Sequence, residues 1–145
     1  MPNDQYYPLQ WHYPMINLPQ AWDVTTGSSD VIVAVIDSGV LASHPDLQGR
    51  LVPGYDFISN VASALDGDGI DDDPSDPGDQ ANAGSSSFHG THVSGTVGAA
   101  TGNRSGVSGV SWDSLLMPLR VLGFQGGGTS YDIMQAMRYA AGLPH

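Results

Sequence analysis

The chain has 145 residues, 40% of them hydrophobic, which is enough for one soluble domain with a hydrophobic core. Its 15 acidic residues are all aspartate, lysine is absent, and the net charge of -11 disfavours nucleic acid and anionic membranes as partners. The sequence contains neither cysteine nor an apolar stretch long enough for a membrane span, so neither a disulfide framework nor a transmembrane protein is indicated.

The first predicted strand covers residues 31–36, which are consecutive apolar and mostly β-branched residues. A continuous apolar run of this kind is typical of a parallel strand that is covered on both faces. Before it, residues 18–23 predict a single helical turn with Pro19 at its start. The strand ends at Asp37, and open α/β sheets place functional groups at the carboxyl ends of their strands. From this position alone, Asp37 can be either a turn cap or a functional carboxylate.

A second, short strand is predicted over residues 51–57, interrupted by Pro53. It is followed by an acidic loop, residues 66–79, in which seven of fourteen residues are aspartate. One interpretation is a solvated, disordered loop, because like charges repel. The other is a calcium loop, because the D-x-D-G start at Asp66 alternates carboxylates and supplies a turn glycine. An EF-hand is rejected because its closing glutamate is absent. We favour ion binding, since so many uncompensated charges would destabilise the fold.

The remaining chain predicts a helix, a strand and a second helix. The first helix starts at His89 and is rich in small residues, which indicates close packing against its neighbours. Residues 115–122 predict the third strand, and Pro118 argues against a central place in the sheet. Thr129 is predicted to cap a helix that stops at Gly142. This order of strands and helices predicts an α/β fold with a parallel sheet and right-handed crossovers.

Asp37 and His89 together indicate the chemistry of a charge-relay hydrolase. A strand-end carboxylate and a helix-start imidazole can converge above a sheet, where the carboxylate orients the ring and the ring takes a proton from a nucleophile. Two alternatives use the same residues. His89 and His92 form an H-x-x-H pair for zinc, but the chain has no glutamate to act as general base. Asp37 can also accept a phosphoryl group in a receiver-like domain, although the lysine that such sites commonly use is absent.

Several segments carry a resemblance to a known family. VIVAVIDSGV, with the HPDL that follows it, is similar to the segment around the family's catalytic aspartate, and HGTHVSGTVGA is similar to the segment around its catalytic histidine. NRSGVSGVSW and MPLRVLG continue in the family's order. On these motifs the chain resembles the subtilisin-like serine proteases (subtilases) over nearly its whole length. The resemblance implies a three-layer, doubly wound, mainly parallel α/β sheet, of which residues 1–145 are the incomplete N-terminal part of a single catalytic domain.

The resemblance also implies roles for individual residues. Asp37 and His89 become the catalytic pair, and the serine nucleophile and oxyanion asparagine are expected in a C-terminal part beyond residue 145. Ser130 stands in a G-T-S sequence without the family's A-x-P, so we interpret it as a helix-cap or turn residue. The substrate cleft, where a peptide pairs as an added strand, is expected at Leu122, Gly123, Gly126 and Gly127. Calcium ligands are expected at Asp4, Asp46, Asn103, Asp56, Asp66, Asp68, Asp71 and Asp73.

The sequence thus predicts a secreted, calcium-stabilised serine endopeptidase that acts on proteins or peptides, with an N-terminal propeptide as a further expected partner. This chain alone is expected to be inactive, because the nucleophile and the oxyanion donor act as a unit with the catalytic pair. The alternative from another class is a non-catalytic, calcium-binding fragment or pseudoprotease that works by interaction. Neither nucleic acid nor a membrane is an expected partner.

Overall fold

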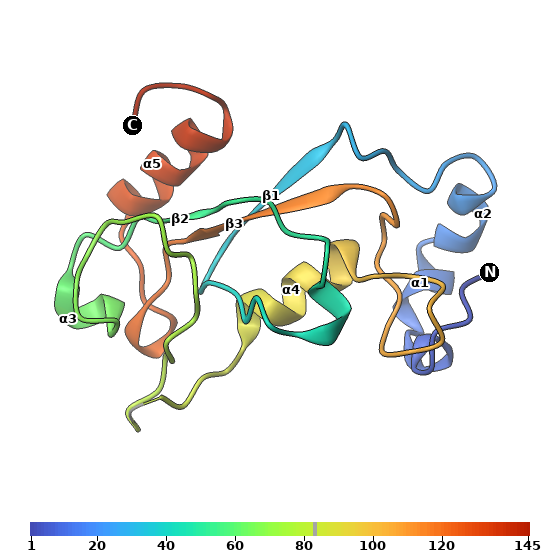
Figure 1. Ribbon diagram of the computed structural model, residues 1–145, viewed down its shortest axis with the longest axis horizontal. Helices are drawn as coiled ribbons and strands as arrows, with labels where there is room; N and C mark the ends of the chain where they lie inside the picture. The colour runs from blue at the N-terminus through green and yellow to red at the C-terminus, as the bar shows by residue number, and fades with distance from the viewer. Residues whose placement is uncertain (83) are drawn as a thin grey trace. The chain divides into compact units, whose positions relative to one another are not determined.

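The computed structural model describes residues 1–82 and 84–145, which form two compact units (Figure 1). Unit 1 contains residues 1–33, 42–51 and 93–116, and unit 2 contains residues 34–41, 52–92 and 117–145. Strands β1 and β3 and helix α4 have residues in both units. Within the described part of the chain, no helix combines the length and the apolar character that crossing a membrane requires.

The sheet has three strands in the order β1-β3-β2, with the bounds β1 Ile32–Asp37, β2 Tyr55–Asp56 and β3 Leu115–Arg120. β2 and β3 pair in parallel. β1 and β3 also run parallel, because the N–H of Leu115 donates to the Val31 carbonyl and the N–H of Val121 donates to the Asp37 carbonyl, so that both chains advance together. The predicted parallel α/β arrangement is confirmed, and Asp37 lies at the edge where the strands end.

The position of Pro118 differs from the prediction, because β3 is the central strand. β3 pairs with the segment that ends in β2 at two places. The first is an isolated bridge between Leu51 and Leu116, and the second is the ladder that begins with Tyr55 and Leu119. The missing N–H of Pro118 therefore falls in the interval where no pair forms. A proline is tolerated in a central strand when it removes no ladder hydrogen bond.

The other two strands also depart from the predictions. β2 is only two residues long, because Pro53 interrupts the segment before it. β1 is not covered on both faces: Ile32 is 49% exposed, whereas Val35 and Asp37 are buried. The described residues leave the start of β1 uncovered, and only its end, which carries the candidate carboxylate, is enclosed.

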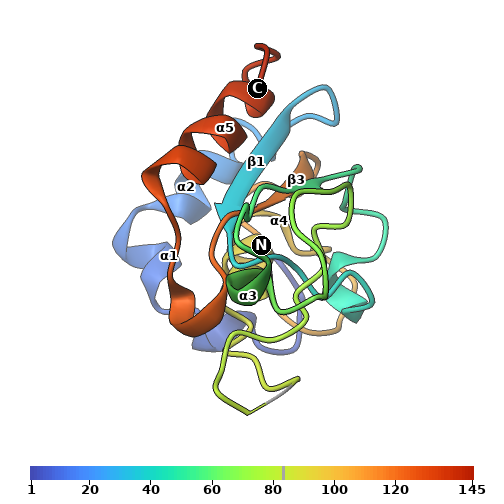
Figure 2. The same ribbon diagram turned by 90° about the vertical axis from the view of Figure 1, so that its left-hand side faces the viewer.

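The core of unit 2 forms where helix α5, Ser130–Ala140, packs on one face of the strands (Figure 2). Ala136 is buried there against Phe57, Leu119 and Val121. The hydroxyl of Thr129 accepts the N–H of Asp132 at 3.0 Å, which confirms the predicted cap. The helix ends before Gly142, whose φ of +68° is the left-handed conformation that glycine adopts most readily.

Ser130 is the first residue of α5 and is exposed, in agreement with its interpretation as a residue at a helix start. Two short elements complete unit 2, namely α3, Val61–Ala64, and the 3-10 turn η3, Phe124–Gly126. The residues predicted for the substrate cleft begin where β3 ends and extend through η3.

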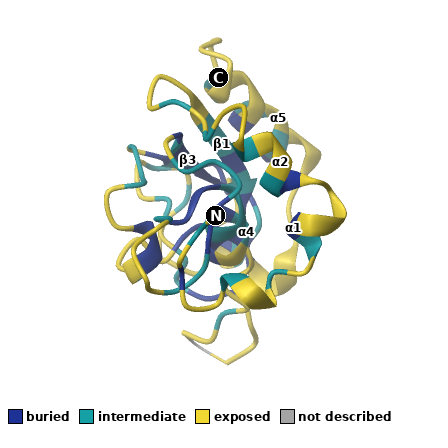
Figure 3. Ribbon diagram, turned by 90° about the vertical axis from the view of Figure 1, so that its right-hand side faces the viewer, coloured by how far each residue is buried: buried dark blue, intermediate teal, exposed yellow. Residues whose placement is uncertain are grey.

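Unit 1 contains four short helical elements, with the bounds η1 Tyr7–Leu9, α1 His12–Met15, α2 Leu18–Trp22 and η2 Pro45–Leu47. Pro19 stands in the first turn of α2, as predicted. Helices α1 and α2 each have exposed and buried residues (Figure 3), and two side chains attach them to the rest of unit 1. The buried Tyr13 donates its hydroxyl to the Ser108 carbonyl at 2.6 Å, and the indole of Trp22 donates to the Val110 carbonyl at 2.8 Å.

Helix α4, His89–Gly98, begins at His89 as predicted. A Cβ at Gly90 would lie 2.2 Å from the carbonyl oxygen of Gly39 and 3.1 Å from Oδ1 of Asp37, so only glycine allows this approach. In the same helix, a Cβ at Gly95 would meet nothing within 4 Å. The close packing predicted from the small residues is therefore confirmed at Gly90, next to the end of β1.

We expect Gly90→Ala to destabilise the fold by about 1–3 kcal/mol, because the added methyl group collides with a backbone oxygen that cannot turn away. The matched control is Gly95→Ala, which should be neutral or stabilising by up to about 1 kcal/mol, since alanine favours the helix and has space. Urea unfolding followed by circular dichroism measures both. Equal unfolding midpoints would contradict the close approach at Gly90.

Candidate active site

Asp37 and His89 meet in unit 2 through a hydrogen bond of 2.7 Å between Oδ1 of the carboxylate and Nδ1 of the imidazole. The Asp37 side chain is 11% exposed, whereas the His89 side chain is 64% exposed. One ring nitrogen is thus held by a buried carboxylate, and Nε2 remains as the nitrogen that can exchange a proton with a reactant. The sequence-based expectation that a strand end and a helix start bring these two groups together agrees with this geometry.

The same two elements are also tied together through Ser38. The N–H of Ser38 donates to Oδ1 of Asp37 at 2.7 Å, and the hydroxyl of Ser38 accepts the N–H of Gly90 at 3.0 Å. At the residue after Gly90 in α4, the hydroxyl of Thr91 accepts the N–H of Leu41 at 2.9 Å. Further contacts between the two segments therefore accompany the hydrogen bond between Asp37 and His89. Sequence analysis did not identify the part of Ser38 in this arrangement.

The pKa of His89 lies above the ordinary value for histidine. The main cause is the hydrogen bond to Asp37, followed by the negative charge of Asp37, while partial burial acts in the opposite direction and the charge of Asp79 adds a smaller increase. The neutral ring, which is the form that can accept a proton, therefore predominates only above this raised pKa. The arrangement suits a general base that is converted to an imidazolium beside a carboxylate.

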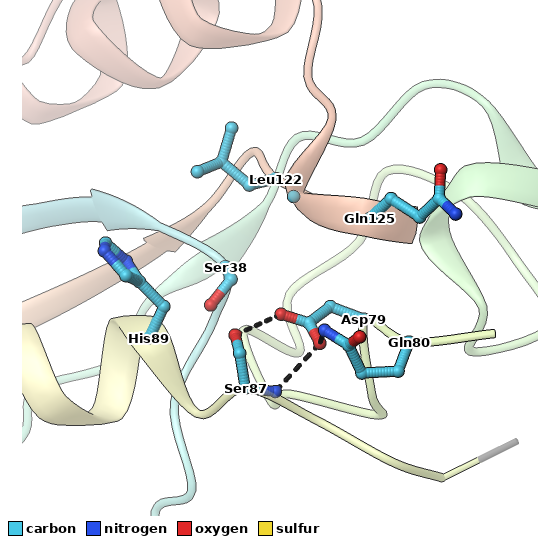
Figure 4. A pocket seen from close by; sticks show the side chains of 8 residues that line it. Ser38, Asp79, Gln80, Ser87, His89, Leu122 and Gln125 are labelled. Atoms are coloured by element: carbon cyan, nitrogen blue, oxygen red, sulfur yellow. Dashed lines mark hydrogen bonds between the residues drawn. The ribbon is translucent and has the colours of Figure 1, made fainter. Parts of the chain in front are cut away.

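A cavity of about 270 Å³ opens beside His89, lined by Ser38, Asp79, Gln80, Ser87, His89, Leu122, Gln125 and Gly126 (Figure 4). Two of the predicted cleft residues, Leu122 and Gly126, line this cavity. Gly123 is not among the residues that line the cavity. A Cβ at Gly123 would be 2.1 Å from the Ser63 carbonyl oxygen, and its N–H donates to the Gly127 carbonyl. The substrate-binding assignments remain predictions.

In unit 1, Asp4 and Asp46 are buried, with 3% and 5% of their surface exposed. The carboxylate of Asp4 accepts the backbone N–H groups of Gly102 and Asn103, and that of Asp46 accepts the N–H of Val107. Among the described residues, neither carboxylate pairs with a cationic side chain. Two buried carboxylates from separate segments thus accept N–H groups of the same loop, residues 102–107, without a cationic partner, and this fits a hard cation to which Asn103 and the loop carbonyls can add oxygen ligands.

The acidic loop of unit 2 is shaped by its own side chains. The carboxylates of Asp66, Asp71, Asp73 and Asp76 each accept the backbone N–H of the residue two positions further on. Such local bonds define a tight turn at each position. They hold in a defined path a segment that the repulsion between like charges would otherwise expand.

Arg120 accounts for two of the predicted metal ligands in a different way. Its guanidinium is fully buried and forms ion pairs with Asp56 and Asp66, and it also donates to the Ala64 carbonyl. Burial raises the pKa of Asp56 to about 6, against the hydrogen bond from Ile58 and the charge of Arg120. Sequence analysis missed this cluster, although an arginine within an apolar strand indicates a carboxylate partner, because arginine is rarely buried alone.

The remaining carboxylates of the loop are not neutralised in this way. The pKa of Asp68 is raised, chiefly by the negative charge of Asp71 and then by slight desolvation and the charge of Asp66. Over residues 1–82 and 84–145, no three histidine or aspartate side chains are gathered closely enough to hold a metal ion. The zinc alternative therefore gains no support, and the calcium ligands remain predictions.

Comparison with known proteins identifies the family of the chain. The model of the Subtilase family matches residues 28–145. The chain belongs to the subtilase family. The extracellular protease of Xanthomonas campestris pv. campestris is 46% identical over 97% of this chain and 26% of its own length, and the extracellular basic protease of Dichelobacter nodosus is 40% identical over 97% and 26%.

A solved structure described as proteases from Pseudoalteromonas arctica matches with a TM-score of 0.90 and 46% identity, covering 99% of this chain and 45% of that one. This match confirms the predicted subtilisin-like α/β fold. Membership of the subtilase family also removes the receiver-like alternative for Asp37. The chain spans about a quarter of the length of the curated relatives named above, 26% in both cases.

We expect Asp37→Asn to lower the pKa of His89 in this subtilase chain. The substitution keeps the shape of the side chain but removes the charge that stabilises the imidazolium. Asp30→Asn, which removes one charge from an exposed residue of unit 1, is the control and should leave the His89 titration unchanged. A pH titration of the histidine ring protons by NMR measures both. An unchanged His89 pKa in Asp37→Asn would show that the pair does not form in solution.

Proposed function

We propose that this chain provides the acid-base pair of an extracellular serine endopeptidase. The observation that carries the proposal is the 2.7 Å hydrogen bond between the buried Asp37 and the exposed ring of His89. Two findings support it: the chain belongs to the subtilase family, and the relatives described above are named as extracellular proteases. The serine nucleophile and the oxyanion asparagine are assigned to the C-terminal part of the same catalytic domain, outside this chain.

In the proposed mechanism, Nε2 of His89 takes the proton of the serine hydroxyl as the oxygen attacks the peptide carbonyl carbon. Asp37 keeps the ring in the tautomer with its proton on Nδ1 and stabilises the imidazolium that forms. The same proton then passes from Nε2 to the leaving amine as the carbon–nitrogen bond breaks. The raised pKa of His89 has the direction that this cycle needs, because Asp37 favours the charged ring.

The proposed substrate is an extended polypeptide that lies as an added strand along Leu122, Gly123, Gly126 and Gly127. Because the N–H groups of these residues already donate within the protein, the peptide would pair with carbonyl oxygens of this segment. The cavity lined by Leu122 and Gly126 adjoins His89 and can receive a substrate side chain close to the reacting bond. An N-terminal propeptide is a further proposed partner, which would occupy the same protein-binding cleft.

The chain mixed with a polypeptide that carries the remaining part of the catalytic domain should hydrolyse a peptide substrate, and a serine-directed inhibitor should abolish this activity. In the same mixture, Asp37→Asn should lower kcat by about 10⁴-fold and His89→Ala by about 10⁶-fold, because the members of a triad act together. Asp30→Asn is the control and should retain activity, because the residue is exposed and lies in unit 1. A folded mixture without inhibitor-sensitive hydrolysis would favour the non-catalytic alternative.

We further propose that calcium stabilises the protein at two places, the loop beside Asp4, Asp46 and Asn103 and the acidic loop. Bound calcium would supply positive charge and oxygen coordination, without a part in the bond-breaking steps. The first place is supported by its two buried carboxylates without a cationic partner. In the acidic loop, Asp68, Asp71 and Asp73 are the better candidates, since Asp56 and Asp66 already contact Arg120.

Removal of calcium by a chelator should lower the Tm of the chain, and readdition of calcium in excess over the chelator should restore it, because a ligand of the folded state stabilises by mass action. At a calcium concentration of about 100 times Kd, the expected stabilisation is about 2.7 kcal/mol. Asp46→Asn should reduce the shift, whereas Asp30→Asn should not. An equal Tm with and without the chelator would contradict calcium binding.

A further inference from the structure

The segment that leads into α4 holds a strained residue directly before His89. Phe88 has a φ of +53°, in the left-handed region that residues other than glycine, asparagine and aspartate adopt rarely. Its side chain is 45% exposed, so packing of the ring does not account for the conformation. Strain of this kind costs about 1–3 kcal/mol and persists only where surrounding contacts hold it. The contacts on either side of Phe88 therefore decide how His89 enters the helix.

Two aspartate–serine pairs form hydrogen bonds in this segment, Asp76 with Ser86 and Asp79 with Ser87. We call these two pairs the clamp. The hydroxyl of Ser86 donates to Asp76 at 2.5 Å and accepts the N–H of Phe88 at 2.9 Å. The carboxylate of Asp79 accepts the N–H of Ser87 at 2.8 Å and also its hydroxyl. On the other side, the Phe88 carbonyl accepts the N–H of His92, which begins the helix.

Asp79 is the more enclosed of the two carboxylates, with 3% of its surface exposed. Its carboxylate also accepts the side-chain amide of Gln80 at 2.6 Å, and its backbone carbonyl accepts the N–H of Gln125 at 2.6 Å. Figure 4 shows the Asp79 carboxylate turned towards Ser87 at the cavity beside His89. Asp79 thus connects the segment before α4 with the loop that carries the predicted cleft residues.

The ionisation of Asp79 is consistent with this position. Burial raises the pKa of Asp79, but the hydrogen bonds from Ser87 and Gln80 outweigh that effect, so that the pKa lies below its ordinary value. Asp79 is therefore charged at neutral pH. Asp37 and Asp79 are the two charged groups that act on His89, and Asp79 makes the smaller contribution to its raised pKa.

We propose that Asp79 is a positioning residue for His89, which acts through Ser87 by holding the strained segment that directs the imidazole towards Asp37. The orientation of the His89 ring by Asp79 can be measured without any catalytic activity. Only its consequence for peptide hydrolysis rests on the proposed function. If the contacts of Asp76 and Asp79 served only to close the acidic loop, no particular orientation of His89 would be required. The two possibilities therefore differ in what the His89–Asp37 hydrogen bond does when the clamp is broken.

The test compares Asp79→Ala, Asp79→Asn and Ser87→Ala in the chain, with Asp72→Asn as the control. Asp72 is an exposed aspartate of the same acidic loop. The first readout is the downfield NMR signal of the proton shared by Nδ1 of His89 and Asp37, and the second is the titration of the His89 ring. We expect the shared-proton signal to be lost or broadened in Asp79→Ala and Ser87→Ala, because both variants loosen Ser87, the residue directly before Phe88. The control should keep it.

Two of the variants distinguish the effect of the Asp79 charge from the effect of its contact with the Ser87 hydroxyl. Asp79→Asn removes the charge but keeps an oxygen acceptor for Ser87, so the His89 pKa should fall while the shared-proton signal is retained at least in part. Ser87→Ala keeps the charge of Asp79 and loses the hydroxyl contact, so the signal should weaken more than the pKa falls. Circular dichroism confirms that each variant is folded, and if Asp79→Ala is not, Ser87→Ala and Asp79→Asn decide the question.

The proposal is overturned if folded Ser87→Ala and Asp79→Ala give the same shared-proton signal and the same His89 titration as Asp72→Asn. In the mixture that contains the nucleophile, Asp79→Ala should lower kcat by about 10²-fold with a smaller change in KM, as expected for a misplaced catalytic group. An inactive wild-type mixture would contradict the proposed protease function but would leave the NMR result on the clamp intact, so the two failures can be told apart.

Discussion

The hydrogen bond between Asp37 and His89 is the contact on which the rest of the site depends, because it joins a strand end and a helix start that are far apart in the sequence. The contact requires the backbones of β1 and α4 to approach closely. Gly90 permits this approach, since any side chain there would collide with the Gly39 carbonyl, and Ser38 bridges the remaining gap. Glycine is a poor helix former, and its place in the first turn of α4 is explained by the approach of Asp37 and His89.

The strongly acidic composition creates a second constraint, because the chain has only four cationic side chains for 15 aspartates. The structure compensates the carboxylates by several routes. The buried Arg120 pairs with Asp56 in the interior and with the partly exposed Asp66. Backbone N–H groups bond to carboxylates in the turns of the acidic loop, and serine hydroxyls bond to Asp76 and Asp79. For some of these carboxylates, among them Asp4 and Asp46, which accept backbone N–H groups but pair with no cationic side chain among the described residues, an external cation is proposed as well.

The acidic loop and His89 are parts of one arrangement in unit 2. The loop begins at Asp66, which is held by Arg120, and it ends at Asp79, which holds Ser87 and contacts the cleft loop at Gln125. Strain at Phe88 lies between the end of the loop and His89. Contacts made by the loop can therefore affect the orientation of the imidazole without touching it. Through the clamp, the end of a loop that sequence analysis interpreted either as a solvated, disordered loop or as an ion-binding loop gains a proposed part in orienting His89.

Features that depend on neighbouring residues could be predicted from the amino-acid sequence alone. They are the strand that ends at Asp37, the helix that starts at His89, the cap at Thr129 and the helix stop at Gly142. The motifs around Asp37 and His89 are also specific enough to indicate the family. Four other features became visible only in the folded chain: the central position of Pro118, the uncovered start of β1, the partners of Arg120 and the clamp around Phe88. Each of these depends on which distant segments become neighbours: a proline is tolerated where its missing N–H faces an unpaired interval, and a buried carboxylate is stabilised by whichever donors the fold brings to it.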